Sequence, residues 1–384
     1  MLDRIVAGSV PRKHHVALRA PDGALRYEQC LTRDGFDGAY TILYHLNRPH
    51  ALEPLQGTRP SPKLIADDAG SAALLRRHYR SSELPAGGTL LEARMPLLWN
   101  ADVTLSVAKP TAEEAVYFVN ADADELFFVQ GGQGRVRSPL GDLAFAAHDY
   151  VCIPKGIAYR LIPEQPLSLF LIECHGGVGL PARFRNALGQ LRMDAPYCHR
   201  DFKRPEHVGP IDEGIRELVI KRSGQHHAMR AQHSLLDVVG WDGTVYPWAF
   251  PIGAFQPRVS SVHLPPTWHG TFEARGALIC SFVPRPLDFA PDAVPCPYPH
   301  SSVDVDEVLY YVSGAFGSRS GVGPGSISLH PAGIPHGPHP GRYEGSLGAK
   351  STDEVAVMLD CYAPLQRSTL ARACEDADYD KSFR

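Results

Sequence analysis

The chain has 384 residues, which is room for about two or three domains of ordinary size. Hydrophobic residues make up 44% of it and charged residues 21%, a globular balance that excludes wholesale disorder. The formal net charge of −4 gives no support for nucleic-acid binding. The 35 glycines and 34 prolines indicate many turns between short strands, so we expect a mainly β protein.

The eight cysteines are scattered through the chain without a CxxC pair, which argues against a structural zinc ribbon and against a disulfide framework. The opening residues, MLDRIVAGSVPRKHH, lack the uninterrupted apolar core of a secretory signal. No apolar run approaches the roughly 18 residues of a membrane helix. We therefore expect a cytoplasmic protein with neither a membrane nor a nucleic acid as partner.

Helical signal is sparse along the chain. Residues 70–79 (GSAALLRRHY) are the best helix candidate in the N-terminal third. Residues 176–250 contain Pro- and Arg-rich loops that we expect to pack over the strands. The last residues, ARACEDADYDKSFR, predict a polar and loosely docked tail.

One degenerate repeat organises the rest of the sequence, with a first copy at 117–163 and a second at 299–340. In both copies a Glu opens an apolar strand that ends seven residues later in a Gly, first at Glu125 and then at Glu307. A second strand and a P-x-G turn follow in each copy. Aromatic and β-branched runs between Asp and Gly are typical of strands, so each copy predicts a small jelly-roll barrel.

The second copy carries a pattern of metal-ligating residues. His300, Glu307 and His336 match the two-part cupin signature, H-x-H-x4-E-x6-G followed by G-x5-P-x-G-x2-H, with Ser302 in place of its second His. Two imidazoles and one carboxylate leave open positions on a metal for substrate and O2, as in non-haem Fe(II) oxygenases. A lone histidine is more often structural, but three residues at two independent spacings predict a metal site.

The first copy lacks this pattern. Its corresponding positions are Phe118, Asn120, Glu125 and Tyr159. One carboxylate beside a Phe and a Tyr does not make a transition-metal site, so we predict that this barrel is structural.

The predicted architecture is therefore a bicupin, with two related barrels and loop-rich N-terminal and inter-barrel extensions. We place an N-terminal domain at residues 1–250, with the degenerate unit at about 111–175. The C-terminal catalytic domain is expected at 251–384, including the polar tail.

Some assignments around the metal pattern stay open. Asp306 competes with Glu307 because it shares strand parity with His300, although the Glu-x6-Gly spacing favours Glu307. His330 is either a structural residue or a contact of the ligands or substrate. His339 is expected to lie at the solvated rim.

The runs YPHSSVDVDEVLYYVSG and SLHPAGIPHGPHPG resemble the homogentisate 1,2-dioxygenase family, in particular its shorter bacterial members. The segments VPRKHH, YTILYHLNRPHALEPL and VHLPPTWHGTFEA are similar to family segments in the same order. The resemblance implies Fe(II) held by His300, Glu307 and His336, with His263 and His330 as active-site histidines. It also implies that homogentisate and O2 give maleylacetoacetate in tyrosine and phenylalanine catabolism, in a trimer-based homo-oligomer.

This sequence differs from the longer family members in three features near the predicted substrate site. Those members have a His-x5-Glu interval where this chain has His-x6-Glu, an Arg where it has Ser301, and a Tyr where it has Phe316. We therefore assign substrate binding to Ser301, Phe316 and His330, and general-base catalysis to His263 with His330 as the alternative. Another hydroquinone-type aromatic acid, a metal-dependent cupin that uses no O2, and a binding protein remain the alternatives.

Overall fold

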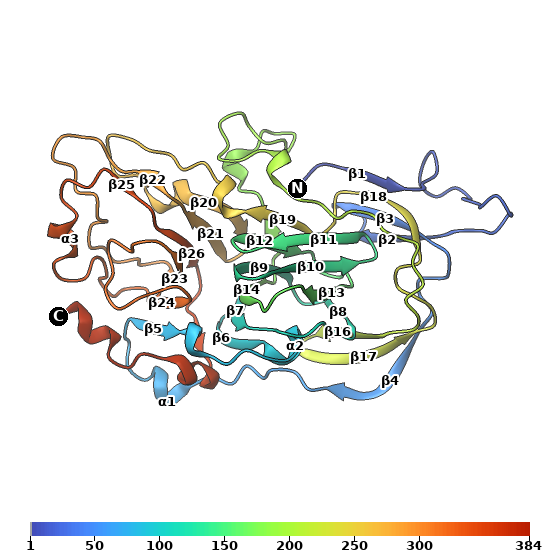
Figure 1. Cartoon of the computed structure of the whole chain (residues 1–384), viewed down its shortest axis with the longest axis horizontal. Coiled ribbons are helices and arrows are strands. Elements are labelled where there is room, and N and C mark those ends of the chain that lie inside the picture. Colours follow the sequence, from blue (N-terminus) through green and yellow to red (C-terminus); the bar gives the residue numbers. More distant parts are fainter. Residues whose placement is uncertain (1) are drawn as a thin grey trace.

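The computed structural model describes residues 2–384, and β-strands dominate it. Within these residues the strands form six sheets, arranged along one long axis (Figure 1). Strands from the C-terminal part occupy one end, strands from about residues 95–175 the middle, and N-terminal strands the other end. The expectation of a mainly β fold is confirmed.

The middle of the molecule is the first barrel, built on a seven-stranded sheet. In order along this sheet lie β19 (Trp248–Pro251), β12 (Asp149–Ile153), β9 (Asp124–Gly131), β14 (Ser168–Cys174), β7 (Val103–Ala108), β6 (Met95–Trp99) and β27 (Gln366–Arg367). Two smaller sheets accompany it: β11 (Gly141–Ala146), β10 (Gln133–Ser138) and β13 (Arg160–Pro163), and β4 (Leu52–Arg59), β17 (Gln225–Ala231), β16 (Glu217–Arg222) and β8 (Tyr117–Asn120).

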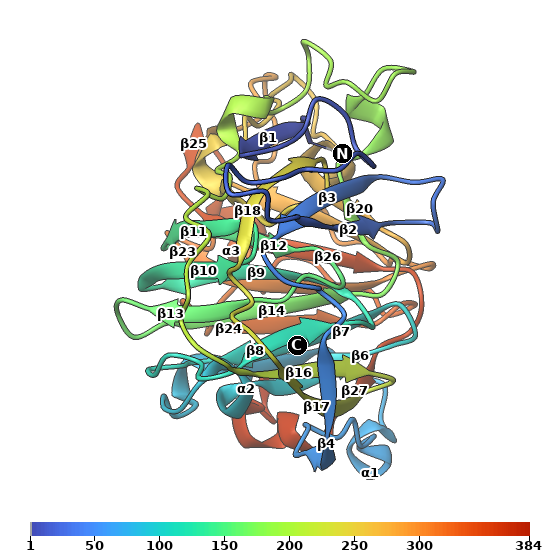
Figure 2. The same cartoon turned by 90° about the vertical axis from the view of Figure 1, so that its right-hand side faces the viewer.

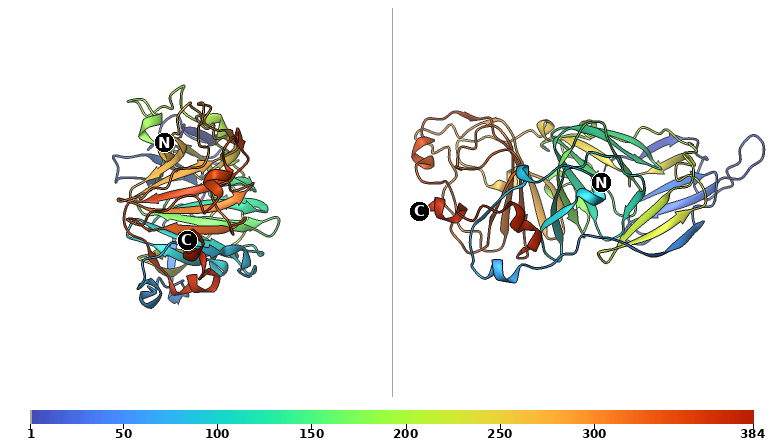
Figure 3. Two further views of the ribbon diagram at one scale, coloured as in Figure 1. Left: turned by 90° about the vertical axis from the view of Figure 1, so that its left-hand side faces the viewer. Right: turned by 60° about the horizontal axis from the view of Figure 1, so that its bottom comes forward.

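The second barrel is built on another seven-stranded sheet, visible face-on in Figure 3. Its order is β15 (Val178–Gly179), β20 (Gly270–Ala274), β21 (Ala277–Phe282), β26 (Val355–Cys361), β23 (Asp306–Ser313), β24 (Ser326–His330) and β5 (Arg77–Arg80). The pair β22 (Arg285–Pro286) and β25 (Ser351–Thr352) lies beside it. The order β12-β9-β14-β7-β6 of the first sheet recurs as β24-β23-β26-β21-β20 in the second.

A four-stranded sheet caps the far end of the first barrel (Figure 2). Its strands are β1 (Ile5–Gly8), β18 (Val238–Gly243), β3 (Tyr40–His45) and β2 (Tyr27–Thr32). It is tied to the barrel through Trp241, whose indole N–H donates to the Leu140 carbonyl over 2.8 Å.

The helices are short. They are α1 (Asp68–Ser71), α2 (Leu90–Ala93) and α3 (Arg342–Gly345), with 3-10 turns η1 (Ser81–Glu83), η2 (Ala182–Phe184), η3 (His199–Asp201), η4 (Ile252–Ala254), η5 (Pro266–His269), η6 (Thr369–Cys374) and η7 (Tyr379–Phe383). No helix among residues 2–384 is long and apolar enough to cross a lipid bilayer.

The two large sheets pack against each other through aromatic side chains. Phe170 of β14 stacks on Tyr310 of β23, with ring centroids 4.7 Å apart and planes within 3°. The Tyr150 hydroxyl meets the Ser281 hydroxyl at 2.9 Å across the same contact. Strands β9 and β23 are therefore buried on both faces, which explains why their sequences read as continuous apolar runs.

The repeated glycines mark equivalent turns in the two barrels. Gly132 follows β9 with φ of +86°, and Gly314 follows β23 with φ of +87°. A Cβ on Gly314 would lie 2.3 Å from the Asp353 carbonyl oxygen. Only glycine satisfies both the left-handed backbone and this close approach.

The helix expected at residues 70–79 is wrong. The Asp67 carboxylate accepts from the Gly70 N–H and caps the short helix α1, and residues 77–80 form strand β5 instead. β5 pairs with β24 and buries His78 and Tyr79 in the second barrel. Tertiary pairing therefore overrides the local helical preference of this segment.

Three strands cross the domain boundary that we place at residue 250, and one of them is β15, which pairs with β20 of the second barrel. β5, from the N-terminal part, belongs to the second barrel, and β27, from the C-terminal part, pairs with β6 of the first. The division into 1–250 and 251–384 stays a prediction. Strands of each part that pair within the sheet of the other part join the two.

The expectation of a loosely docked C-terminal tail is wrong. Tyr379 is only 4% exposed, and Asp380 pairs with Arg76 at 2.8 Å. The Phe383 ring lies against Arg76 on one side and against His339 on the other, with a centroid distance of 4.3 Å to each partner. His339 is accordingly buried and not solvated as expected, because the aromatic residues of the tail cover it.

Candidate metal centre

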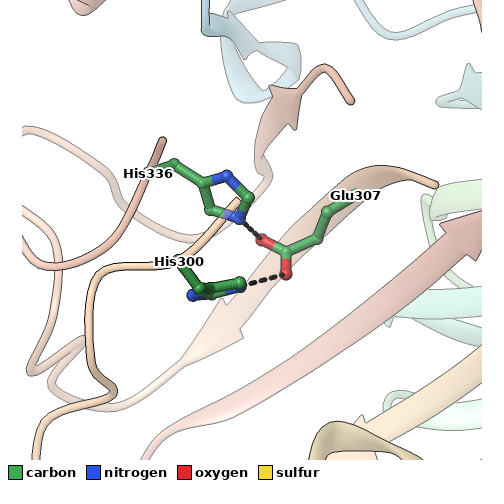
Figure 4. Close-up of side chains that lie close together, drawn as sticks. All are labelled: His300, Glu307 and His336. Carbon is green, nitrogen blue, oxygen red and sulfur yellow. Dashed lines mark ion pairs between the residues drawn. The ribbon is translucent and has the colours of Figure 1, made fainter. Parts of the chain in front are cut away.

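His300, Glu307 and His336 come together in the second barrel, and a nitrogen or oxygen of each lies within 4.8 Å of the others (Figure 4). Glu307 lies near the start of β23, while the two histidines sit on loop segments that pair with each other. The backbone N–H of each histidine donates to the carbonyl of the other over 2.8 Å. This reciprocal pairing holds the two imidazoles on the same side of Glu307.

Backbone carbonyls orient both rings. His300 donates from Nδ1 to the Tyr298 carbonyl (3.0 Å), and His336 donates from Nδ1 to the Ile334 carbonyl (3.2 Å). Each ring therefore directs its unprotonated Nε2 toward the Glu307 carboxylate, at 3.9 Å from His300 and 3.5 Å from His336. Hydrogen bonds from the other ring nitrogen to a backbone carbonyl are typical of metal-ligating histidines.

A metal ion fits this arrangement. Nε2 of His336 is buried and has no hydrogen-bond partner among the described residues. Two nitrogen lone pairs and a carboxylate converging in a buried space repel one another unless a cation lies between them. Two imidazoles and one carboxylate are a donor set suited to Fe, Mn, Co, Ni or Zn.

His330 lies behind Glu307, away from the cavity. Its Nδ1 donates to Glu307 Oε1 over 2.8 Å, and its Nε2 lies 3.5 Å from the Tyr379 hydroxyl. Burial, only partly offset by Glu307, lowers its pKa to about 3, so the ring is neutral. Burial alone would raise the pKa of Glu307, but the three imidazoles around it, with His330 as the hydrogen-bond donor, lower that pKa well below its ordinary value. The structure thus makes His330 a support of Glu307.

Asp306 and Glu307 have different roles, since Asp306 binds backbone N–H groups and Glu307 faces the histidines. Asp306 accepts from the backbone N–H groups of Ala332 and Leu365 (2.8 and 2.7 Å), so it ties the P-x-G turn to the strand. Asp124 does the same in the first barrel, accepting from Lys155 and Val178. The open choice between the two carboxylates is thereby resolved in favour of Glu307 as the one that faces the histidines.

The metal centre opens into a cavity of about 990 Å³. Its lining includes His263, His300, Glu307 and Phe316, whereas Ser301 is exposed and lies outside it. The His263 ring lies 5.2 Å from that of Tyr298, which in turn lies 6.2 Å from His300. Partial burial lowers the pKa of His263, which keeps this imidazole neutral near pH 7.

Asp360 is a cavity residue that the motif search missed. It lies on β26 directly opposite Glu307, and burial together with the Glu307 charge raises its pKa to about 7. The pair Asp360-Cys361 repeats Glu173-Cys174 of the first barrel, where Glu173 lies opposite Glu125. That repeat of an acid before a Cys is the signal that could have found it.

The first barrel reproduces the backbone of the site with other side chains. Phe118 and Tyr159 exchange backbone hydrogen bonds of 2.8 and 2.9 Å, as His300 and His336 do. The Tyr159 hydroxyl donates to Glu125 Oε2 over 2.6 Å. Phe118 and Tyr159, which we predict to replace the two histidine ligands in this copy, therefore occupy positions structurally equivalent to those ligands.

An arginine takes the place of a metal in the first barrel. Arg94 is buried and lies 2.6 Å from Glu125 and 3.5 Å from Glu173. Glu173 also accepts from Lys221 and from the Asn120 amide. Burial opposes the charge of Arg94, but the two carboxylates outweigh it and raise its pKa, so the guanidinium stays charged.

Comparison with known proteins agrees with this geometry. A family model described as the N-terminal part of homogentisate 1,2-dioxygenase matches residues 103–252, which contain most strands of the first barrel. A protein of Saccharolobus solfataricus, named as a candidate dioxygenase, is 33% identical over 98% of this chain and 97% of its own length. The chain belongs to the homogentisate 1,2-dioxygenase family.

More distant members of the family also align along the whole chain. The homogentisate 1,2-dioxygenase of Pseudomonas putida is 27% identical over 98% of this chain and 92% of its own length. Among solved structures, a cupin 2 conserved barrel protein from Leptotrichia buccalis covers 79% of the chain at 10% identity, with a TM-score of 0.35. That score is too low to support an argument, and membership of the family rests on sequence.

Replacing Arg94 by Met should destabilise the protein strongly. The variant leaves Glu125 and Glu173 buried without their shared cation, and breaking such a buried pair costs about 3–5 kcal/mol. Urea denaturation measures the loss, and Arg275→Met is the control because its side chain is 73% exposed. An Arg94→Met variant as stable as the control would show that the carboxylates do not depend on this charge.

Replacing His226 by Gln should make the protein less sensitive to acid. Burial, aided by the charges of Arg94 and Lys221, lowers the pKa of His226 to about 4. As the pH falls, His226 is therefore protonated in the unfolded chain before it is protonated in the folded protein. The free energy of unfolding decreases as the pH falls from about 6.5 to 4. The free energy of unfolding, measured at pH 7 and pH 4.5, should fall less in the variant, by about 2 kcal/mol. Equal falls in both proteins would contradict this assignment.

Proposed function

We propose that this protein is an Fe(II)-dependent ring-cleaving dioxygenase that converts homogentisate and O2 into maleylacetoacetate. The observation that carries the proposal is the convergence of His300, Glu307 and His336, with two unprotonated Nε2 atoms facing one carboxylate beside a large cavity. Membership of the homogentisate 1,2-dioxygenase family supports the substrate and the reaction class.

The three proposed ligands would hold Fe(II) through Nε2 of His300, a carboxylate oxygen of Glu307 and Nε2 of His336. Bound there, the metal would lower the pKa of a coordinated phenol and offer positions at which the aromatic ring and O2 meet. None of the three ligands is free to act as a base, so proton transfer falls to other residues of the cavity.

His263 is the proposed general base. It lies on the cavity wall, it is neutral near pH 7, and it is free to accept the proton of a substrate hydroxyl. His330 is less suited because Glu307 already occupies its Nδ1 and because it lies outside the cavity lining. We assign His330 instead to orienting Glu307. Phe316 remains the proposed contact of the aromatic ring, and Ser301, which is exposed, is withdrawn from the cavity contacts.

The alternative functions differ from the proposed one in substrate or in the use of O2, so experiments distinguish them. A different para-dihydroxy aromatic acid would use the same ligands and base. A metal cupin that consumes no O2 would bind the metal but fail in oxygen uptake. The expected trimer-based homo-oligomer and the cytoplasmic location both stay predictions.

Adding homogentisate to anaerobically prepared, Fe(II)-loaded protein should cause stoichiometric O2 uptake when air is admitted. His336→Ala should bind less than a tenth of the metal and lose the uptake, because two remaining ligands hold a first-row metal poorly. An oxygen electrode and metal analysis measure the two effects. Uptake that persists in a metal-free His336→Ala protein would refute the site. Folded, iron-loaded parent protein without uptake would refute homogentisate as substrate.

Replacing His263 by Ala should lower kcat by about 10²- to 10⁴-fold, the usual contribution of a positioned base. Metal content should not change, because His263 contacts none of the three proposed ligands directly. Steady-state oxygen uptake measures kcat, and His50→Ala serves as the control because His50 is exposed and precedes β4. A His263→Ala variant with the kcat of the parent would rule out the base assignment.

A further inference from the structure

The cavity beside the candidate metal centre contains one buried arginine whose charge no carboxylate matches. Arg258, Arg285, Arg319 and Arg342 line it. Arg258 and Arg285 pair with Asp194 and Glu354, and Arg342 is exposed to solvent. Arg319 is only 7% exposed, and among residues 2–384 no carboxylate lies within ion-pair distance of it.

Backbone contacts hold the Arg319 side chain in place. The residue follows β23 in a turn, where its N–H donates to the Phe316 carbonyl over 3.2 Å. Its Nη1 donates to the carbonyl of Gly337, the residue after His336. The guanidinium is thus anchored to the same loop that carries a proposed metal ligand.

Part of the hydrogen-bonding capacity of Arg319 is not used by the protein, although the Tyr311 and Tyr379 hydroxyls also contact the guanidinium. Nε is buried and has no hydrogen-bond partner among the described residues. A buried guanidinium without an anion is costly, so its presence calls for a negatively charged partner. Burial works against its charge, but Tyr311, Tyr379 and Glu307 outweigh burial and raise its pKa, so the group remains a cation.

The surroundings of Arg319 suit an aromatic ligand. Phe316 and Tyr311 line the same cavity, with their rings edge to face at 4.9 Å. Glu307 and His300 line it as well, so the guanidinium and the candidate metal centre share one cavity. The charge of Arg319 acts on both His300 and His330, which places it within electrostatic range of the site.

We propose that Arg319 binds the carboxylate of an aromatic acid substrate and so selects acids over neutral aromatics at this site. The inference rests on the proposed function and adds the residue that recognises the acid. The planar fork of a guanidinium matches a carboxylate in two parallel hydrogen bonds, and the dry surroundings strengthen them. Arg319 is a specificity residue, and the other cavity arginines do not share this role.

Anaerobic titration calorimetry of the metal-loaded protein tests the assignment with two matched pairs of ligands. The pairs are homogentisate and its methyl ester, and gentisate and its methyl ester. The parent should bind each acid more tightly than its ester. In Arg319→Met the affinity for the acids should fall by about 10- to 100-fold while that for the esters changes little. Arg342→Met is the control, since Arg342 lines the same cavity but is exposed, and it should keep the acid preference.

A second variant covers the case in which Arg319→Met fails to fold. Arg319→Lys keeps the charge but loses the planar fork, so the acid preference should shrink without vanishing. A parent that binds neither acid better than its ester would overturn the proposal. So would Arg319→Met or Arg319→Lys with the acid preference of the parent, or a loss that affects acids and esters equally.

The same titrations separate this proposal from the proposed function. Preference for gentisate that depends on Arg319, in a protein that neither binds nor oxidises homogentisate, would support the role of Arg319 and refute the substrate. Oxygen uptake with homogentisate at an affinity that Arg319→Met leaves unchanged would support the function and refute the role of Arg319.

Discussion

A buried carboxylate at the centre of each barrel is the constraint on which the rest of the structure depends. Glu125 and Glu307 lie at the same position of equivalent strands, both nearly inaccessible to water. An ionised carboxylate in that position needs a cation or several donors close by. The two barrels meet the need differently, with an arginine beside Glu125 in the first and histidines around Glu307 in the second.

The backbone does not decide which barrel carries the chemistry. The reciprocal hydrogen bonds of Phe118 with Tyr159 and of His300 with His336 are nearly identical in length. In the first barrel Arg94 supplies a permanent charge on a covalent tether and fills the space beside Glu125. In the second, two imidazoles direct free nitrogen atoms at Glu307 and leave room for an exchangeable ion. A tethered guanidinium stabilises the fold but offers no site at which substrate and O2 could meet.

Segments far apart in the chain complete the second barrel. β5, from residues 77–80, adds the edge strand beside β24, which ends in His330. The C-terminal turn η7 brings Tyr379 next to His330 and Phe383 next to His339. Strand β5 and the C-terminal turn η7 thus pack around His330, the support of Glu307, on the side away from the cavity. The cavity itself stays open toward His263, Phe316 and Arg319.

The sequence by itself determined the repeat, the mainly β fold and the three converging residues, because these follow from short-range spacing. Glu-x6-Gly and P-x-G describe a strand and two turns, and local backbone geometry places their side chains with little help from the rest of the chain. The repeat of an acidic residue before a cysteine, at Glu173-Cys174 and Asp360-Cys361, is another short-range pattern, and it indicates Asp360. Tertiary structure alone decided the strand at 77–80, the docked tail and the exposed position of Ser301. It also revealed the two buried arginines, Arg94 and Arg319, one paired with carboxylates and one not. The physical reason is that burial and pairing depend on partners outside the local segment, and for strand β5 and the C-terminal tail these partners are more than 200 residues away.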